Sequence, residues 1–235
     1  MILKSKRSTH ESSFFGFNRG IYFFTICICL SIAGSFTVPS RSSAFLERPE
    51  AIIEMSCGEE NVDANKILLV YDTKYGSTAT VAEKIGNTLC EQGLQVDVRF
   101  ARTVKRTEVS GYDGIIVGSA IIYEMWLPGA INFLRRSRDI LAEKMVAYFL
   151  VCATMREETE ERLERVQEHY VEPLLEKFPE IEPVIEMGTF AGMVDYEKMY
   201  PLDSFLMGLM DFPGGDWRSF DKIGTWAEEV AAMME

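Results

Sequence analysis

The sequence predicts an α/β fold in which a parallel sheet is covered by helices on both faces. Short apolar runs alternate along the chain with longer segments whose apolar residues recur at helical spacing. The connections between them are short, as expected when successive parallel strands are joined by helical crossovers. In such sheets a ligand binds at the carboxyl ends of the strands, so a binding site is expected in the loops that follow the strands.

Five segments read as strands. The first is a continuous apolar run, typical of a central strand that is buried on both faces, and the second alternates between apolar and polar residues. The third ends in a glycine. The predicted strands are Ile67–Tyr71, Val96–Phe100, Tyr112–Gly118, Met145–Val151 and Pro183–Gly188.

Four segments read as helices: Ala79–Glu91, Gly129–Arg138, Glu157–Phe178 and Phe220–Met234. Gly93 is expected to stop the first, because glycine readily adopts the left-handed conformation that ends helices. The third is highly charged, and Pro173 is expected to kink or shorten it. Its predicted inward face comprises Leu163, Val166, Tyr170 and Leu174.

The segment TKYGST, residues 73–78, joins the first strand to the first helix and is the most informative stretch of the chain. Thr73, Ser77 and Thr78 offer hydroxyls, and the backbone N–H groups at a helix N-terminus favour an anion. Gly76 permits a tight turn, and no acid lies within the segment. An ordinary helix cap would need one hydroxyl only, so the pattern favours phosphate binding.

Several other chemistries are disfavoured. The loop lacks the Walker and GxGxxG patterns, which argues against ATP and dinucleotides. The net charge of −12 disfavours nucleic acid. No Ser–His–Asp or Cys–His arrangement is evident, and His169 is expected to face solvent. The five cysteines are scattered without a CxxC, so we predict neither a metal site nor a disulfide.

At this point the residues resemble a known family. Thr73-x-x-Gly76-x-Thr78 after an apolar strand resembles the FMN phosphate loop of flavodoxins, and GSAIIY at 118–123 resembles their second flavin loop. The methionine-rich stretch 196–212 and GGDWRSFD at 214–221, followed by Trp226, are more particular. Together they resemble the menaquinone-dependent protoporphyrinogen dehydrogenase branch of the flavodoxin superfamily over residues 66–234.

The resemblance implies a flavodoxin-like fold, with five parallel strands in the order 2-1-3-4-5, and non-covalently bound FMN. It further implies an oxidoreductase that takes hydrogen from protoporphyrinogen IX in haem synthesis and passes electrons to a quinone. The alternative is a membrane-tethered or exported flavodoxin-type electron carrier that serves a protein redox partner. The sequence identifies no catalytic residue for either.

The resemblance also assigns cofactor-binding residues. Tyr123 is expected to contact the flavin, and Trp126 either to stack on the flavin or to lie in the core. Lys74 has two alternatives, contact with the phosphate or, as we expect from its own character, exposure to solvent. The implied flavin ligands are Thr73, Lys74, Tyr75, Gly76, Ser77 and Thr78 at the phosphate, Ser119, Ala120, Ile121, Ile122 and Tyr123 along the isoalloxazine edge, and Cys152, Ala153 and Thr154 in a third loop.

An apolar cluster precedes the C-terminal motif. One interpretation is a surface for quinone, porphyrin or lipid. The other is a helix that packs on the sheet. The cluster comprises Met199, Leu202, Phe205, Leu206, Met207, Leu209, Met210 and Phe212.

The N-terminal region is expected to lie outside the fold. Residues 1–45 combine a basic flank, the uncharged run Ile21–Val38 and small residues, which is typical of a signal peptide or a membrane anchor. Residues 46–65 read as a linker and 66–235 as the flavodoxin-like domain. An N-inside orientation would place the domain outside the cytoplasm and argue against a haem-pathway substrate. A true start at Met55 would leave the domain at the cytoplasmic face.

Overall fold

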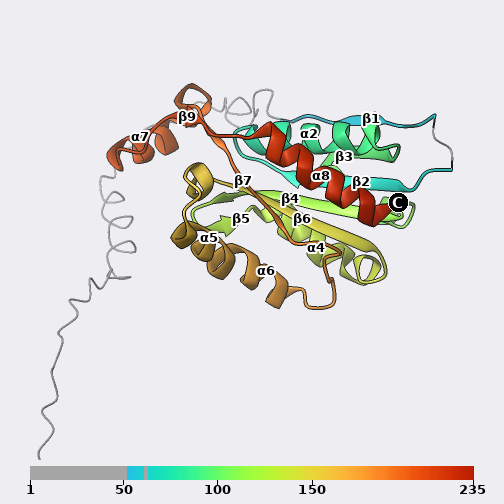
Figure 1. Ribbon diagram of the computed structural model, residues 1–235. Helices are drawn as coiled ribbons and strands as arrows, with labels where there is room; N and C mark the ends of the chain where they lie inside the picture. The colour runs from blue at the N-terminus through green and yellow to red at the C-terminus, as the bar shows by residue number, and fades with distance from the viewer. Residues whose placement is uncertain (1–51, 61–62) are drawn as a thin grey trace, which may run out of the picture. The chain divides into compact units, whose positions relative to one another are not determined.

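The structure is a computed structural model that describes residues 52–60 and 63–235 (Figure 1). The segment predicted as a signal peptide or anchor, including Ile21–Val38, lies outside the described residues. In the part of the chain that the structure describes, no helix is long and apolar enough to cross a bilayer.

The core of the fold is a sheet of five parallel strands. They are β2 (Lys66–Asp72), β3 (Gln95–Phe100), β4 (Gly114–Ile122), β6 (Met145–Cys152) and β7 (Gly188–Ala191). Their spatial order is β3-β2-β4-β6-β7, which is the predicted order 2-1-3-4-5. The chain therefore reverses direction across the sheet between β2 and β4, where the loops after these strands diverge and leave room for a ligand.

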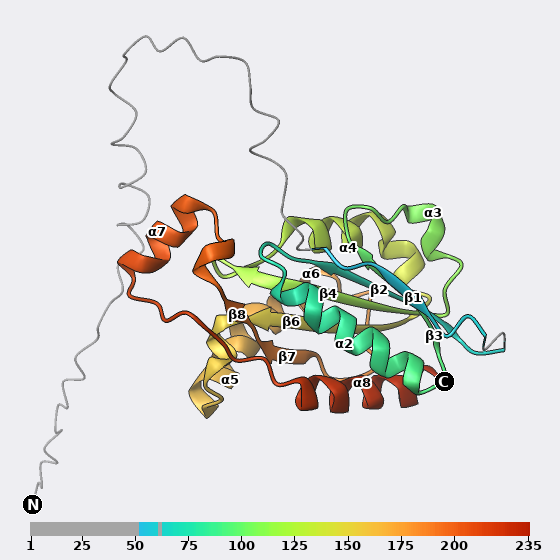
Figure 2. The ribbon, with the colours of Figure 1, turned by 90° about the horizontal axis from the view of Figure 1, so that it is seen from above.

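Helices cover both faces of the sheet (Figure 2). Helices α2 (Ser77–Glu91) and α8 (Phe220–Met234) pack on one face, and α4 (Pro128–Leu141) lies on the other. The alternation of side chains along β2 shows why both faces need cover. Ile67, Leu69 and Tyr71 are buried under α2 and α8, while Leu68 and Val70 are buried on the side of α4.

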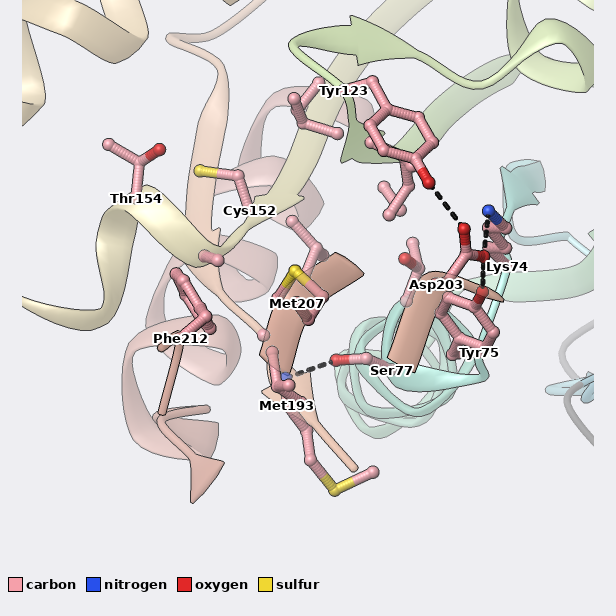
Figure 3. A pocket seen from close by; sticks show the side chains of 18 of the residues that line it. Lys74, Tyr75, Ser77, Tyr123, Cys152, Thr154, Met193, Asp203, Met207 and Phe212 are labelled. Carbon is pink, nitrogen blue, oxygen red and sulfur yellow. Dashed lines mark hydrogen bonds and ion pairs between the residues drawn. The ribbon is translucent and has the colours of Figure 1, made fainter. Parts of the chain in front are cut away.

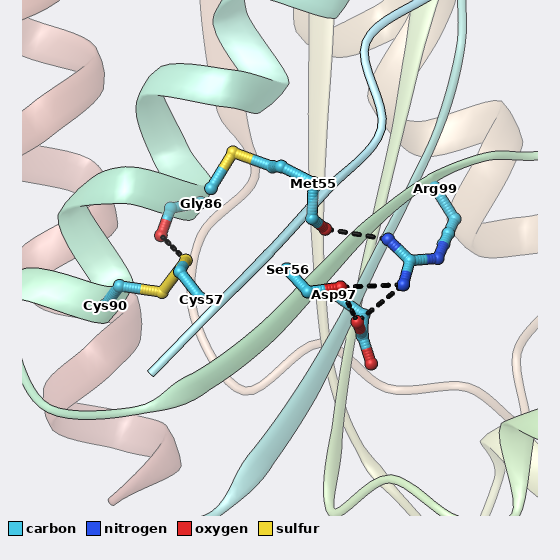
Figure 4. The surroundings of a disulfide bond; sticks show 7 residues. All are labelled: Met55, Ser56, Cys57, Gly86, Cys90, Asp97 and Arg99. Carbon is cyan, nitrogen blue, oxygen red and sulfur yellow. Dashed lines mark hydrogen bonds and ion pairs between the residues drawn. A yellow bond between two sulfur atoms is a disulfide. The ribbon is translucent and has the colours of Figure 1, made fainter. Parts of the chain in front are cut away.

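The predicted linker 46–65 contains a strand, β1 (Met55–Cys57), which pairs antiparallel with β3 at the edge of the sheet. The Arg99 guanidinium on β3 donates to the Met55 carbonyl at 2.7 Å and to the Ser56 hydroxyl at 2.8 Å (Figure 4). A run of three residues is too short to be recognised as a strand from its sequence pattern. Once β3 lies beside them, its free edge supplies the backbone partners that make them a strand.

The expectation of no disulfide is wrong, because Cys57 on β1 is bonded to Cys90 on α2 (Figure 4). The two cysteines are 33 residues apart, and their Cα atoms lie 6.0 Å from each other. Sequence spacing alone gives no sign of the pair. The tertiary packing brings it together by placing the edge strand alongside the last turns of α2.

Two strand predictions shift. The fifth strand, expected at Pro183–Gly188, forms at Gly188–Ala191, where it pairs with Phe149–Cys152 of β6. Pro183 makes only an isolated bridge to Val146, since proline has no N–H to donate to a ladder. The third strand, expected to end at Gly118, continues to Ile122 and turns back into the short antiparallel strand β5 (Met125–Trp126).

The long charged helix is interrupted, as Pro173 suggested. It consists of α5 (Glu160–Val166), a π-helical turn η2 (Gln167–Val171) and α6 (Glu172–Lys177). The π turn precedes Pro173, whose missing N–H breaks the regular hydrogen-bond pattern. Leu163 is 45% exposed, so its predicted inward position is wrong, whereas the other three predicted inward residues are buried.

The remaining elements are α3 (Arg106–Val109), η1 (Ala153–Arg156), η3 (Tyr196–Lys198) and α7 (Pro201–Leu209). A two-stranded ladder of β8 (Met193–Val194) and β9 (Gly215–Asp216) joins the two ends of the segment 195–214. This segment, hereafter the α7 segment, therefore leaves the fold after β7 and returns to it before α8. Its base lies at the carboxyl end of the sheet.

Candidate functional site

A pocket of about 320 Å³ opens at the carboxyl ends of the parallel strands (Figure 3). Four parts of the fold line it: the loop after β2 with the start of α2, the end of β4, the loop after β6, and the segment after β7. The α7 segment contributes a further wall. This is the position that the strand order predicts for a ligand.

The pocket brings together twelve of the fourteen residues that the sequence nominated. They are Thr73, Lys74, Tyr75, Ser77, Thr78, Ala120, Ile121, Ile122, Tyr123, Cys152, Ala153 and Thr154. Gly76 and Ser119 do not line it. Gly76 has φ +87° at the start of α2, so it shapes the loop through its backbone. The Ser119 hydroxyl is buried and accepts the Leu127 N–H at 2.9 Å, which fixes the connection to α4.

The loop after β2 presents donors without a competing acid. The Thr78 Oγ1 atom is buried and has no hydrogen-bond partner among the described residues. The Ser77 hydroxyl accepts the Met193 N–H at 2.8 Å and keeps its own proton to donate (Figure 3). The first turn of α2 contains no acidic residue. A buried hydroxyl that the protein leaves unsatisfied, at a helix N-terminus, fits a phosphate ligand.

An acid does lie immediately before this loop, but it is directed elsewhere. Asp72 is fully buried, and its carboxylate accepts the Gly129 N–H at 2.7 Å and the Thr73 N–H at 3.1 Å. The carboxylate therefore stabilises the N-terminus of α4. A Cβ on Gly129 would lie 2.4 Å from the Asp72 carboxylate, so only glycine allows this approach. Asp72 therefore does not compete with an external anion for Ser77 and Thr78 on the pocket side of the loop.

Lys74 does not project into solvent as expected. Its ammonium lies 2.5 Å from the Asp203 carboxylate on α7, and both side chains are mostly shielded from water. The Tyr75 and Tyr123 hydroxyls donate to the same carboxylate (Figure 3). Burial pushes the pKa of Asp203 upward, but the hydrogen bonds from Lys74 and the two tyrosines outweigh it and hold that pKa below its usual value.

Tyr123 lies in a tight turn at the mouth of the pocket. Its φ is +52° and that of Glu124 is +63°, as in the two-residue turns that join β4 to β5 in a hairpin. The ring is 63% exposed. The hydrogen bond to Asp203 raises the pKa of Tyr123 to about 12. Trp126 takes the other of its two predicted places: it is 9% exposed, belongs to the core, and donates its indole N–H to the Tyr170 carbonyl at 3.0 Å.

The third predicted loop contributes a buried thiol. Cys152 lies at the end of β6 and lines the pocket, and burial raises the pKa of its thiol. A thiol whose pKa is raised stays protonated at neutral pH and is a poor nucleophile. Cys152 therefore acts as a wall of the pocket. His169 is exposed, as predicted, and lies outside the pocket.

The α7 segment supplies an apolar wall. The apolar residues of this segment that line the pocket are Met199, Leu206, Met207, Met210 and Phe212, of which Leu206 and Met210 are also exposed to solvent. No residue of α7 is buried, so the interpretation of this helix as one packed on the sheet is wrong. Leu202, Phe205 and Leu209 point outward and are each more than 60% exposed. The helix thus has an apolar inner side over the pocket and an apolar outer side toward solvent.

Some pocket residues were not predicted: Glu124, Val151, Tyr170, Gly192, Met193, Val194 and Asp203. The run Gly192–Val194 directly follows β7, so correct placement of the fifth strand would have found it by the rule for strand ends. Asp203 carries no comparable signal, because a lone acid in an apolar stretch has no motif.

Comparisons with known proteins agree with this geometry. The family model described as a flavodoxin domain matches residues 68–216. Protoporphyrinogen IX dehydrogenase (quinone) of Escherichia coli strain K12 is 22% identical over 179 residues, which cover 72% of this chain and 97% of that protein.

Similar solved structures are those of flavodoxins. A flavodoxin of Streptococcus pneumonia TIGR4 is 18% identical, with a TM-score of 0.45, over 71% of this chain and 98% of that one. Flavodoxin 2 of Bacillus cereus is 23% identical, with a TM-score of 0.46, over 71% of this chain and 98% of that one.

Proposed function

Because the chain belongs to the flavodoxin-domain family, whose cofactor is FMN, we propose that it is an FMN-dependent oxidoreductase that dehydrogenates protoporphyrinogen IX and reduces a quinone. FMN supplies the electron-transfer chemistry, and the protein supplies binding, orientation and exclusion of water. The loop of residues 73–78 would hold the phosphate through Thr78, Ser77 and the first N–H groups of α2. The end of β4 and Tyr123 would lie along the ring.

The observation that carries this proposal is the apolar wall beside the loops that hold the flavin. Leu206, Met207 and Met210 face the same pocket as Thr78 and Tyr123. Methionine and leucine side chains adapt to a flat apolar ring system and offer it no polar competition. Quinones have such a ring, and the pyrrole rings of protoporphyrinogen, a non-planar molecule with two carboxylates, offer further apolar surface. Similarity to the dehydrogenase of E. coli extends over nearly the whole of that protein and supports the same assignment.

A second candidate is an exported flavodoxin-type electron carrier with a protein redox partner. The Cys57–Cys90 disulfide favours it, because disulfides persist mainly in oxidising compartments outside the cytoplasm. The basic and apolar pattern of residues 1–45 points in the same direction. A domain in such a compartment would be separated from haem synthesis and would need electrons from another protein.

Membrane association belongs to both candidates. Leu202, Phe205 and Leu209 form an exposed apolar surface on α7, and a quinone acceptor resides in the bilayer. The N-terminal segment 1–45 would add a tether. The proposed location is thus the membrane surface, outside the cytoplasm if residues 1–45 export the domain and otherwise at the cytoplasmic face.

The deciding experiment follows the visible absorbance of the FMN-loaded full chain without oxygen. Protoporphyrinogen IX is added first and a menaquinone analogue second. The proposed enzyme bleaches the flavin band with the first addition and recovers it with the second. A flavin that stays oxidised with protoporphyrinogen, yet is reduced by a protein reductase, would reject the enzyme and favour the carrier. A cofactor-free preparation controls for direct reaction between the two additions.

A further inference from the structure

Asp203 is the only charged residue of α7, and its side chain points into the fold. Its carboxylate lies 2.5 Å from the Lys74 ammonium and 2.5 Å from the Tyr123 hydroxyl, and it also accepts a hydrogen bond from the Tyr75 hydroxyl (Figure 3). One carboxylate therefore joins three parts of the pocket: the phosphate loop, the turn after β4 and the α7 segment.

Apolar packing does not explain why α7 stays over the pocket. None of its side chains is buried. Within the described residues, the side-chain hydrogen bonds and ion pairs that join α7 to the rest of the fold all end on Asp203. A neighbouring ring contact, Tyr75 against Tyr200 with centroids 5.9 Å apart, adds to the same corner. Among the side chains of α7, Asp203 thus provides the polar attachment of the helix to the pocket.

The Lys74 ammonium is surrounded by groups that attract a positive charge: the Asp203 carboxylate and two tyrosine rings. The Lys74 ammonium lies 5.3 Å from the centre of the Tyr75 ring and 5.2 Å from that of Tyr123, so both rings face the cation. A partly buried carboxylate with three donors keeps its charge, and loss of that charge would leave the ammonium unpaired. The pKa of Asp203 is held below its usual value, in agreement with a permanent ion pair at neutral pH.

We propose that Asp203 is a positioning residue that holds α7 as the ceiling of the pocket and thereby makes the pocket select flat apolar electron acceptors. Its contacts hold the helix that carries Leu206, Met207 and Met210, which line the pocket where an acceptor would meet the flavin. A small hydrophilic oxidant that takes electrons at the exposed edge near Tyr123 has no need of this ceiling. The inference rests on the proposed reduction of a quinone.

The test uses the FMN-loaded full chain, reduced with dithionite without oxygen and then mixed with an acceptor. Menadione takes two electrons and two protons to give its quinol, whereas each ferricyanide ion takes one electron. In Asp203→Asn we expect the menadione concentration for half-maximal rate of flavin oxidation, here called KM, to rise about tenfold, with the limiting oxidation rate, the rate with ferricyanide and the FMN Kd within about threefold of wild type. Chymotrypsin should also cut faster at Phe205.

Asp211→Asn is the matched control. It removes the same charge two residues beyond α7, where the side chain is exposed and φ is +49°, a conformation that asparagine tolerates. It should behave as wild type in all five measurements. Asp203→Glu, which restores the carboxylate, should recover part of the menadione KM and of the resistance to chymotrypsin.

Wild-type KM and wild-type cleavage in Asp203→Asn would overturn the inference. A different failure belongs to the proposed function: wild-type protein that reduces ferricyanide but neither menadione nor a menaquinone analogue is not a quinone reductase. The cleavage rate then decides the role of Asp203 in holding α7, and equal rates in wild type and Asp203→Asn would reject that role too.

Discussion

The two ends of the pocket are built in opposite ways. At the phosphate end, Thr73 and Thr78 are buried, and the loop lies between a central strand and a helix that both belong to the core. At the other end, α7 has no buried residue and is attached through Asp203. A continuous hydrophobic core positions the first site, whereas a carboxylate with three donors holds the helix at the second.

The difference follows from what each end has to recognise. A phosphate dianion is bound by fixed N–H and O–H dipoles, whose value depends on their being held in place before the ligand arrives. An apolar ring is bound by contact area, which an adaptable helix can supply without exact placement. We infer that substitutions at the phosphate end weaken FMN binding strongly, whereas substitutions in the α7 segment change mainly which apolar molecule the pocket accepts.

The largest effect is expected at the phosphate end. Replacement of Thr73 and Thr78 by alanine removes two charge-assisted hydrogen bonds of about 1.5–3 kcal/mol each, so the FMN Kd should rise about 100-fold or more. Equilibrium dialysis of FMN with the purified chain measures it. Thr88→Ala is the control. Like Thr78, Thr88 is a buried threonine of α2 whose hydroxyl has no hydrogen-bond partner among the described residues, but it lies outside the pocket. Full FMN occupancy in the double variant would refute the phosphate assignment.

The second prediction is that the disulfide stabilises the part of the fold at the phosphate end and does not hold α7. Cys57 and Cys90 enclose the loop of residues 73–78 but not α7. Closure of a 33-residue loop contributes about 3–4 kcal/mol to the free energy of unfolding. Cys90→Ser should therefore lower Tm by roughly 6–16 °C in a domain of this size, as followed by circular dichroism.

Cleavage of α7 by chymotrypsin should not change in Cys90→Ser. A reductant should lower the Tm of wild type and leave that of the variant unchanged. Equal melting temperatures of wild type and variant without reductant would show that the two cysteines are not bonded in the folded protein.

The smallest effect concerns pH at the α7 attachment. The pKa of Asp203 is lowered on folding, so its contribution is present above the usual carboxyl pKa of about 4 and is lost as pH falls through the lower folded value. Tyr123 behaves in the opposite sense. Its pKa is raised to about 12, so its contribution is complete below pH 10, the usual tyrosine pKa, and is lost as pH rises toward 12.

Tyrosinate absorbance measures the alkaline limb. At pH 11, Asp203→Asn should show more ionised tyrosine than wild type, because the hydrogen bond that protects Tyr123 is gone. Adding Tyr123→Phe to Asp203→Asn should remove the part of that difference that belongs to Tyr123, and the remainder belongs to Tyr75, which donates to the same carboxylate. An identical absorbance for wild type and Asp203→Asn would mean that Asp203 does not control the ionisation of Tyr123.

Apolar periodicity and turn residues predicted helices and helix ends well, because these features depend on residues close together in the chain. Gly93 ended α2, Phe220–Met234 formed α8, and residues 73–78 lay at a helix N-terminus because a buried strand and an amphipathic helix flank them. The predicted bounds were wrong where pairing with a neighbouring strand determines the element. Strand β7 is placed by its register with β6, and β1 exists because β3 offers an unpaired edge.

Short-range patterns in the sequence determined the alternation of strands and helices and the position of residues 73–78 between a strand and a helix, since apolar periodicity and turn residues act over short distances. The strand order and the family followed from the resemblance to flavodoxins. The tertiary structure alone decided the Cys57–Cys90 pair, the core position of Trp126 and the meeting of Lys74, Tyr75, Tyr123 and Asp203. Asp203 is separated from Tyr123 by 80 residues and from Tyr75 by 128. Contacts over such separations leave no local pattern, because they form only when the sheet brings the ends of its strands to one edge.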